Sequence, residues 1–362
     1  MVEPQAPRRA GWVGAGPRGL AARLYPMPSR PADRPPLELL APWLRQRFGQ
    51  ALHRVALDAG STCPNRDGTR GRGGCVYCDV EGSGTGALKS GLDIGSQLRL
   101  GLERIARRGP DVGAIAYFQS YSNTYVAPER LDEVLAAVEP WLDAPPEGLP
   151  PIRVLALATR PDTLPEWALA RLERLASRVP VWLELGLEAA DDGVLERIHR
   201  LHSVAEFEDA VARAQARGLA VVGHAILGLP GDGRAGARRT AEVLARSGVE
   251  GVKVHHLLVL RRTVLERWWR DQHSGAKDHG LELLTPETYV DWLADFVERL
   301  RPEQVLHRLT ADAPPGQELA PRWTVAKEEV RQRLIAELQR RGNAQGSHAG
   351  RSAEGPLPHT TR

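Results

Sequence analysis

Short apolar runs alternate with amphipathic segments through most of this chain. The apolar runs predict strands at residues 52–58, 112–118, 152–158, 181–188, 220–227 and 251–259. Between them, Leu, Ile, Val and Ala recur at the spacing of a buried helix face, which predicts helices at residues 92–108, 129–138, 166–178, 204–217 and 237–246. Because strand and helix alternate about six times, we expect parallel strands joined by helical crossovers.

Polar residues recur at the carboxyl ends of most of these strands. They lie at residues 61–79, 119–124, 159–162, 184–188, 228–231 and 253–256. An open doubly wound sheet would produce the same alternation of elements, but α/β barrels gather their functional side chains at one mouth in this way. The expected fold is therefore α/β, a partial (β/α)6 TIM-like barrel.

The two ends of the chain lack this periodicity and are rich in small and polar residues. After the sixth strand, the pattern predicts a helix near residues 287–300, a short strand at 305–309 and a last helix from about 324 to 340. We expect four parts: a disordered Pro/Arg/Gly-rich lead at 1–36, a barrel at 37–260, a helical C-terminal extension packed on the barrel at 261–340, and a disordered tail at 341–362.

Composition limits the class of protein but does not identify a binding partner. Hydrophobic residues make up 42% of the chain, which is enough for a full core, and the net charge is only +3. That balance neither demands nor excludes nucleic acid, because a local basic patch matters more than the total. No apolar run reaches the roughly 18 residues of a membrane helix, so we expect no membrane partner and a cytoplasmic location.

The chain has three cysteines, Cys63, Cys75 and Cys78, all within one short stretch. Three thiolates can hold three irons of a four-iron cluster and leave the fourth iron open, whereas a fully Cys-ligated cluster needs four. A structural zinc site with Asp79 or His53 as its fourth ligand is the alternative. A disulfide is not expected in a reducing compartment.

The sequence around these cysteines resembles a known signature. Cys63-Pro-Asn-Arg-Asp-Gly-Thr, followed by Gly-Gly-Cys75 and an aromatic residue before Cys78, is similar to radical S-adenosylmethionine (radical SAM) enzymes. More narrowly, it resembles the Elp3-like branch, in the bacterial YhcC/YtqA-type family. Further similar stretches follow in order at residues 117–125, 159–162, 182–188, 224–231, 252–255, 307–310 and 321–323. The resemblance covers about residues 37–340 and implies a barrel of the radical SAM type.

The resemblance implies a [4Fe–4S] cluster on Cys63, Cys75 and Cys78, with S-adenosylmethionine chelating the fourth iron. One electron from a ferredoxin, flavodoxin or other one-electron reductase would cleave the sulfonium and give a 5′-deoxyadenosyl radical that abstracts a substrate hydrogen. Elp3-like relatives act on transfer RNA at the wobble uridine, so tRNA is the implied partner. A small carboxylate-bearing metabolite remains an alternative substrate, and a zinc-stabilised nucleic-acid-binding protein without catalysis is the alternative function.

Several residues stand where the family binds its cofactor. Tyr77 could stack beside the adenine or be a packed aromatic residue. Gln119, Ser120 and Asn123 stand where related enzymes hold the methionine amino group, usually with a Gly-Gly-Glu stretch that is missing here. A polar turn at a strand end would look the same.

Glu184 and Glu188 lie on one face of a predicted strand, so both should point into the barrel. Two interior carboxylates are costly unless they bind something, such as ribose hydroxyls or a cationic group. Arg160 follows the preceding strand and could clamp a carboxylate or phosphate. The alternatives are salt bridges from these glutamates to Arg160 or Arg197, and a pair between Arg160 and its neighbour Asp162.

Other candidates lie on the fifth and sixth strands. Gly228 and Gly231 form a predicted tight turn that would let the backbone approach the adenine, although an ordinary strand-to-helix turn would look the same. Lys253 and His255 share a face of the sixth strand and are the catalytic candidates. The alternative for Lys253 is an ion pair with a glutamate inside the barrel.

One segment departs from the family pattern. Residues 197–202 match the family's Arg-x-Asn-Arg-Gly-His except at His199 and Leu201. We expect this segment at the start of a helix.

Overall fold

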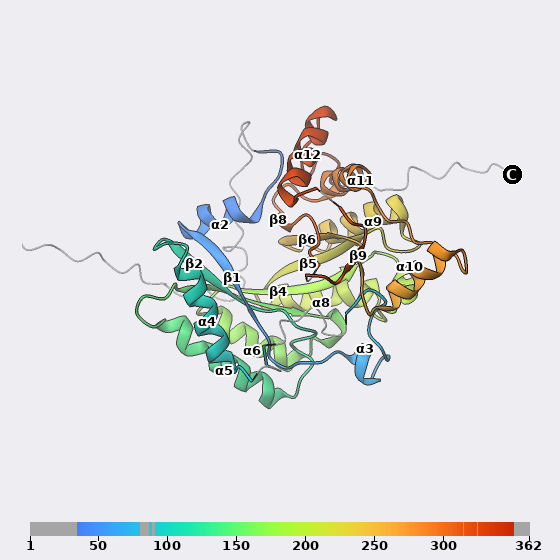
Figure 1. Cartoon of the computed structure of the whole chain (residues 1–362). Helices are drawn as coiled ribbons and strands as arrows, with labels where there is room; N and C mark the ends of the chain where they lie inside the picture. The colour runs from blue at the N-terminus through green and yellow to red at the C-terminus, as the bar shows by residue number, and fades with distance from the viewer. Residues whose placement is uncertain (1–34, 80–86, 89–90, 314, 324, 351–362) are drawn as a thin grey trace, which may run out of the picture.

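A curled sheet of seven parallel strands organises the protein in the computed structural model, which describes residues 35–350 except 80–86, 89–90, 314 and 324 (Figure 1). The strands are paired in the order β1-β2-β3-β4-β5-β6-β8, and every neighbouring pair is parallel. Their bounds are β1 Ala51–Leu57, β2 Val112–Phe118, β3 Ile152–Thr159, β4 Val181–Glu188, β5 Ala220–Leu227, β6 Gly251–His256 and β8 Val305–Arg308. The expected α/β partial barrel is confirmed.

Helices cover the outer face of this sheet (Figure 1). The crossover helices are α4 Ile94–Ala106, α5 Pro128–Asp143, α6 Glu166–Ala176, α8 Val204–Ala216 and α9 Gly233–Arg246, with α11 Pro286–Arg299 beside α9. Each turns an apolar stripe inward; in α6 that stripe includes Leu169, Leu172 and Leu175. β2 and β4 are buried along their whole length, so both their faces are covered.

The amino end of the barrel is closed by α2 Leu40–Phe48, a helix that the sequence pattern did not predict. It contacts both edge strands, β1 and β8. Trp43 and Leu44 of α2 join Ile115, Trp182 and Val305 from the strands in one apolar cluster inside the curl of the sheet. We call this cluster the floor. It seals one end and leaves the carboxyl ends of the strands as the open end.

The C-terminal extension adds more than helices. The short strand expected at 305–309 is β8, which enters the main sheet as its seventh strand, so the sheet extends beyond the six expected strands. The expected strand at 251–259 is divided: β6 ends at His256, and β7 Val259–Leu260 pairs antiparallel with β9 Glu318–Ala320. The remaining elements are α3 Pro64–Asp67, a 3-10 turn at Pro161–Thr163, α7 Asp192–Arg197, α10 Val264–Ser274 and α12 Lys327–Arg340.

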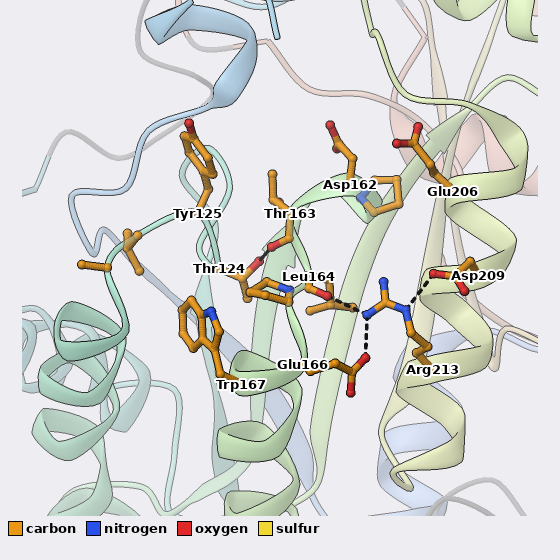
Figure 2. Close-up of a pocket in the computed structure, with 14 residues that line it drawn as sticks. Thr124, Tyr125, Asp162, Thr163, Leu164, Glu166, Trp167, Glu206, Asp209 and Arg213 are labelled. Carbon is orange, nitrogen blue, oxygen red and sulfur yellow. Dashed lines mark hydrogen bonds and ion pairs between the residues drawn. The ribbon is translucent and has the colours of Figure 1, made fainter. Parts of the chain in front are cut away.

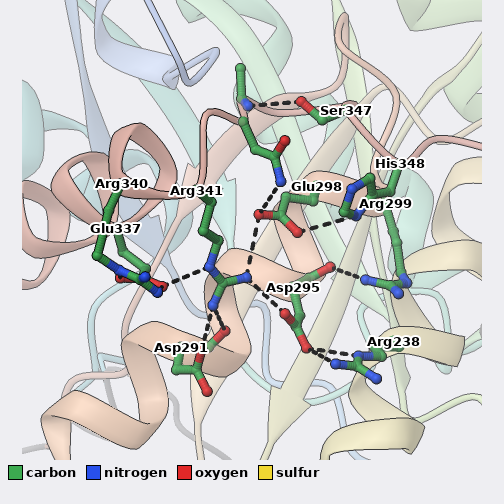
Figure 3. A network of polar contacts seen from close by, with 12 residues as sticks. Arg238, Asp291, Asp295, Glu298, Arg299, Glu337, Arg340, Arg341, Ser347 and His348 are labelled. Carbon is green, nitrogen blue, oxygen red and sulfur yellow. Dashed lines mark hydrogen bonds and ion pairs between the residues drawn. The ribbon is translucent and has the colours of Figure 1, made fainter.

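Part of the expected disordered tail is folded. Residues 341–350 form turns that pack against the start of the barrel and against α11. The Gln345 side chain accepts a hydrogen bond from the Glu38 amide (3.0 Å) and donates to the carbonyl of Gln304 (2.6 Å). Arg341 bridges several carboxylates of α11 (Figure 3). The expected disorder at 1–34 and 351–362 lies outside the described residues.

Among the helices of the described ranges, none combines the length and the apolar character that crossing a membrane requires.

Candidate active site

One cavity of about 490 Å³ runs from the cysteine loop into the barrel. It is lined by most of the residues singled out from the sequence, namely Cys63, Cys75, Tyr77, Cys78, Gln119, Arg160, Glu184, Glu188, Lys253 and His255. Because these residues come from the ends of different strands, their convergence matches the expected mouth of a parallel barrel.

A larger hollow of about 890 Å³ lies elsewhere, beside α6 and α8 (Figure 2). No cysteine lines it. Its arginine, Arg213, donates hydrogen bonds to Asp209 (2.7 Å) and Glu166 (3.1 Å). The charged groups of this hollow therefore largely satisfy one another, and the chemistry is concentrated in the smaller cavity.

The cysteine loop folds back on itself around a single helical turn, α3. The amide of Arg66 donates to the Cys63 carbonyl (2.8 Å), and the amide of Gly74 donates to the Asn65 carbonyl (2.8 Å). Gly74 has φ of 82°, a left-handed conformation that glycine adopts without a steric penalty. This reversal brings Cys75 back toward Cys63, so both face the same cavity.

Nitrogen donors point at two of the three sulfurs. A guanidinium nitrogen of Arg66 lies 3.2 Å from Sγ of Cys78, and the Asn65 amide lies 3.6 Å from Sγ of Cys75. A guanidinium nitrogen of Arg200 also lies 3.8 Å from Sγ of Cys75. Burial and the neighbouring Cys75 raise the pKa of the Cys78 thiol to about 11, while Arg66 opposes this rise. These donors stabilise the negative charge of a thiolate, which is the form in which cysteine binds a metal.

The segment of residues 198–202 clamps the cysteine loop. The Val76 amide donates to the Ile198 carbonyl (3.0 Å), and a ring nitrogen of His199 lies 2.9 Å from the Gly74 carbonyl oxygen. Arg70 donates to the Leu201 carbonyl (2.9 Å). The segment was expected at a helix start; instead it connects the end of α7 to α8, which begins at Val204.

The two departures from the family pattern fall on strained backbone in this segment. His199 has φ of 56° and Leu201 has φ of 59°, both left-handed. Asn and Gly, the residues of the family pattern, adopt this conformation more readily than other residues. Residues 198–202 therefore keep the left-handed turn, although the Asn and Gly that adopt it most readily are replaced by His199 and Leu201.

A polar layer lies above the floor, on the inner face of the strands. Lys253 forms an ion pair with Glu184, and His224 lies 3.2 Å from the same carboxylate oxygen. The Lys253 ammonium also lies 4.6 Å from the ring centroid of Tyr117. The alternative of a Lys–Glu pair inside the barrel is thus what the structure contains, and Glu184 pairs with neither Arg160 nor Arg197.

Burial and charge shift the pKa values of this layer in opposite directions. Burial would raise the pKa of Glu184, but Lys253, His224 and Arg54 together outweigh it and hold that pKa well below its usual range. Burial lowers the pKa of Lys253 to about 7, although Glu184 opposes this. Burial also lowers the pKa of His255 well below its usual range. The layer therefore holds an ionised carboxylate beside a lysine that titrates near neutral pH.

The remaining charged candidates have partners within the protein. Arg160 forms two hydrogen bonds with Asp162, of 2.8 and 2.9 Å, as one alternative anticipated. Glu188 lies 3.4 Å from Arg200. Both residues still line the cavity.

Four sequence candidates do not line the cavity. Asn123 donates to the carbonyls of Phe118 and Ala158, which joins the ends of β2 and β3. Ser120 is fully buried nearby. Gly228 and Gly231, with φ of 90° and 86°, form the expected tight turn, and Gly228 faces Leu284.

Sequence reasoning missed several residues that line the same cavity, including Arg54, Tyr117, Arg200, His224 and Arg308. For Arg54 a signal existed. It shares a face with Leu52 and Ala56 on the first predicted strand, so period two places a charged residue on a face that is otherwise apolar.

The proposed zinc alternative finds little support in side-chain positions. His53 faces Arg45 and Arg108, which lower its pKa together with burial, and it does not line the cavity. Within the described ranges, no group of three or more His, Cys, Asp and Glu side chains, the three cysteines included, is arranged to hold a single metal ion, so this finding does not choose between zinc and a cluster.

A curled parallel sheet whose strand ends meet a cysteine loop defines an α/β half-barrel enzyme, and comparison with known proteins gives its family. Residues 65–244 match the family model described as "Radical SAM superfamily", and residues 249–340 match "Radical_SAM C-terminal domain". The chain is 34% identical over 311 residues to the uncharacterized protein YtqA of Bacillus subtilis (strain 168), which covers 86% of this chain and 92% of that one. It is 34% identical over 316 residues to protein YhcC of Escherichia coli (strain K12), which covers 85% and 94%.

A solved structure supports the fold. The archaeal Elp3 of Methanocaldococcus infernus, with an N-terminal deletion, is similar at a TM-score of 0.62 and 16% identity, covering 81% of this chain and 64% of that chain. The chain belongs to the radical SAM superfamily, in the family of YtqA and YhcC, and it is a radical SAM enzyme.

Proposed function

We propose that the protein binds one [4Fe–4S] cluster through Cys63, Cys75 and Cys78 and uses it to cleave S-adenosylmethionine reductively. The observation that carries this proposal is that all three cysteines open onto one cavity that continues into the barrel. All three are free of disulfides. A three-cysteine set leaves one iron of a four-iron cluster without a protein ligand.

The residues around the sulfurs fit such a group. Arg66, Asn65 and Arg200 direct N–H donors at Cys78 and Cys75, which suits the negative charge of cluster-bound sulfur. When bound, the cluster would supply the electron that converts S-adenosylmethionine to methionine and a 5′-deoxyadenosyl radical. The protein would position the cofactor and exclude water.

Other cavity residues would hold S-adenosylmethionine. Tyr77 and Gln119 line the cavity beside the cysteines. Glu188 lies at the end of β4, where it could accept hydrogen bonds from ribose hydroxyls. We propose Lys253 and His255, one layer deeper, as residues that contact the substrate.

Product analysis tests this proposal. Protein purified and reconstituted without oxygen should contain about four irons per chain. Reduction with dithionite in the presence of S-adenosylmethionine should release 5′-deoxyadenosine, and C75A should release none. Colourless protein with one zinc, or iron-loaded wild type that forms no 5′-deoxyadenosine, would overturn the proposal.

For the biological substrate we propose the wobble uridine of transfer RNA. The support is a relative named tRNA uridine(34) acetyltransferase from Dehalococcoides mccartyi (strain CBDB1), 25% identical over 163 residues, which covers 44% of this chain and 33% of that one. Nucleoside analysis of tRNA from a deletion strain tests this. Loss of one modified wobble uridine is expected; an unchanged nucleoside profile would overturn it.

We further propose a cytoplasmic location and a ferredoxin- or flavodoxin-type electron donor. Thiolates that hold a cluster persist in a reducing compartment. Such a donor would support 5′-deoxyadenosine formation in place of dithionite. If neither carrier protein did so, this part would fail.

A further inference from the structure

We infer that the deep end of the cavity binds an anionic group of the substrate, a carboxylate or a phosphate, between Arg54 and Arg308. The inference rests on the proposed function, because it takes the occupant of the barrel to be the substrate. It assigns a chemical class to that substrate and places the anion at the opposite end of the cavity from the cysteines.

The two arginines lie on the edge strands of the half-barrel. Arg54 is on β1 and Arg308 ends β8, and both line the same cavity as the cysteines. Both guanidinium groups act electrostatically on Tyr117 and Lys253: they oppose the rise that burial causes in the Tyr117 pKa and add to the lowering that burial causes in the Lys253 pKa. They therefore flank one volume, directly above the apolar floor that contains Leu52.

Arg54 has buried nitrogens without partners. Its Nε and one terminal nitrogen are inaccessible to solvent and form no hydrogen bond among the described residues. The guanidinium carbon of Arg54 lies over the Tyr117 ring, 5.9 Å from the ring centroid. The side chain of Arg308, which is half-buried, likewise forms no hydrogen bond or ion pair with the described residues. A buried guanidinium without a counter-charge is costly, so its retention points to a ligand.

The carboxylates of the cavity neutralise these arginines only in part: Arg54 helps to lower the pKa of Glu184, but no hydrogen bond or ion pair joins the two side chains. Glu184 is engaged by Lys253 and His224, and Glu188 by Arg200. The third carboxylate, Asp312, forms an ion pair with Lys327. Neither arginine therefore has a directly bound carboxylate, and one bound anion would supply that partner.

The pKa values of neighbouring groups agree with an excess of positive charge. Burial lowers the pKa of His307 well below its usual range, and the charge of Arg54 lowers it further. Burial lowers the pKa of Lys253 to about 7, with Arg54 and Arg308 acting in the same direction. The positive charge of the arginines therefore disfavours protonation of His307 and of Lys253.

Binding of simple anions to the reconstituted enzyme tests the inference. The probes are sulfate, as a stand-in for a phosphate group, and malonate, as a carboxylate, measured by calorimetry without oxygen and with S-adenosylmethionine present. One anion should bind per chain, and R54Q and R308Q should each weaken binding by about tenfold or more. R246Q serves as the control, because Arg246 is 59% exposed on α9 and pairs with Glu208. A preference for one probe tells a phosphate-bearing substrate from a carboxylate-bearing one.

A stability measurement separates a ligand site from a structural arginine. If Arg54 serves a ligand, R54M should match or exceed the wild-type melting temperature, and sulfate should raise the melting temperature of wild type but not of R54M. If Arg54 holds the fold together, R54M should melt well below wild type.

Three results would overturn the inference. These are unchanged anion binding in R54Q and R308Q, a large loss of stability in R54M, and loss of anion binding when S-adenosylmethionine is added. The last would assign these arginines to the cofactor's own carboxylate. Failure of the proposed function would be visible separately, as wild-type protein that forms no 5′-deoxyadenosine.

Discussion

The guanidinium of Arg66 donates to Sγ of Cys78 at 3.2 Å, and one short loop separates the two residues in sequence. The same side chain donates to the Asp79 carbonyl and lies 5.4 Å from the ring centroid of Tyr121. These contacts fix its direction. The chain thus places a permanent positive charge beside one of its three cysteines.

Replacing Arg66 should make the cluster harder to reduce. R66Q removes a positive charge and a hydrogen bond to sulfur, two of the factors that set cluster potentials. A loss of about 1 kcal/mol of stabilisation of the reduced state corresponds to roughly 40 mV for one electron. We therefore expect a midpoint potential more negative by tens of millivolts in an anaerobic redox titration followed by electron paramagnetic resonance. R72Q, in the same loop but exposed, is the control, and equal potentials in R66Q and wild type would contradict this role.

Anion binding should weaken as pH rises through about 7. Burial lowers the pKa of Lys253 to about 7, so the lysine is charged below that pH and neutral above it. Sulfate is a suitable probe, because its own charge does not change in this range. Calorimetric titrations at several pH values should give a falling affinity in wild type and a flat profile in K253Q. The titratable and charged groups facing Lys253 are Arg54, Tyr117, Glu184, His224, His255, His307 and Arg308.

Affinity that stays constant from pH 6 to pH 8 in wild type, about one unit either side of that pKa, would show that Lys253 does not titrate there. Affinity that falls equally in K253Q would assign the pH dependence to another group of the layer.

A buried carboxylate joins two helices and the folded tail (Figure 3). Asp295 on α11 pairs with Arg234 (2.7 Å) and Arg238 (2.5 Å) of α9 and with Arg341 (2.8 Å). Burial would raise the pKa of Asp295, but the hydrogen bonds from these arginines hold it far below its usual range.

Replacing this carboxylate should destabilise the protein. Because the arginines are partly exposed, we expect D295N to lose about 1–3 kcal/mol at pH 7 in denaturant unfolding. A lowered folded-state pKa gives stability that is present above the unfolded pKa of about 3.9 and lost as pH falls below it, so the difference from wild type should shrink toward pH 3. D209N, which breaks a pair between neighbouring turns of α8, should lose less than about 0.5 kcal/mol. Equal effects of the two variants would contradict the account.

The cysteine loop should not tolerate a side chain at Gly71. A Cβ there would contact the side chains of Asn65 and Leu201, and would lie 3.0 Å from the His199 ring. G71A should therefore shift the loop against its clamp, cost about 1–3 kcal/mol and lower the iron retained per chain. G95A is the control, because a Cβ at Gly95, in the first turn of α4, meets only Asp93 at 3.5 Å. Iron content equal to wild type in G71A would show that the clamp does not position the cysteines.

The strands were predictable because short apolar runs mark them and because the segments between them have apolar residues at helical spacing. β2, β4 and β5 begin and end where the apolar runs do. The floor was not predictable in this way. α2 is short and contains Pro42, and its apolar side chains find partners only across the barrel, in strands far along the chain.

Among the site residues, too, those with a local sequence signal were predictable and those that depend on distant partners were not. The cysteines stood out because their chemistry and spacing are local. The pair between Arg160 and its neighbour Asp162 could be anticipated from the sequence, whereas the role of Asn123 depended on the carbonyl of Ala158, a partner that only the fold supplies. The folded tail was missed because Gln345 is satisfied by residues more than 40 positions away, which composition cannot reveal.

Electron paramagnetic resonance of the reduced protein, recorded with and without S-adenosylmethionine, tests most directly whether a cluster one cysteine short of full ligation receives the cofactor. We predict the spectrum of a reduced four-iron cluster that changes shape when S-adenosylmethionine is added, and no such spectrum from C63A. A spectrum that is indifferent to S-adenosylmethionine, or protein that holds no cluster after anaerobic reconstitution, would contradict the account.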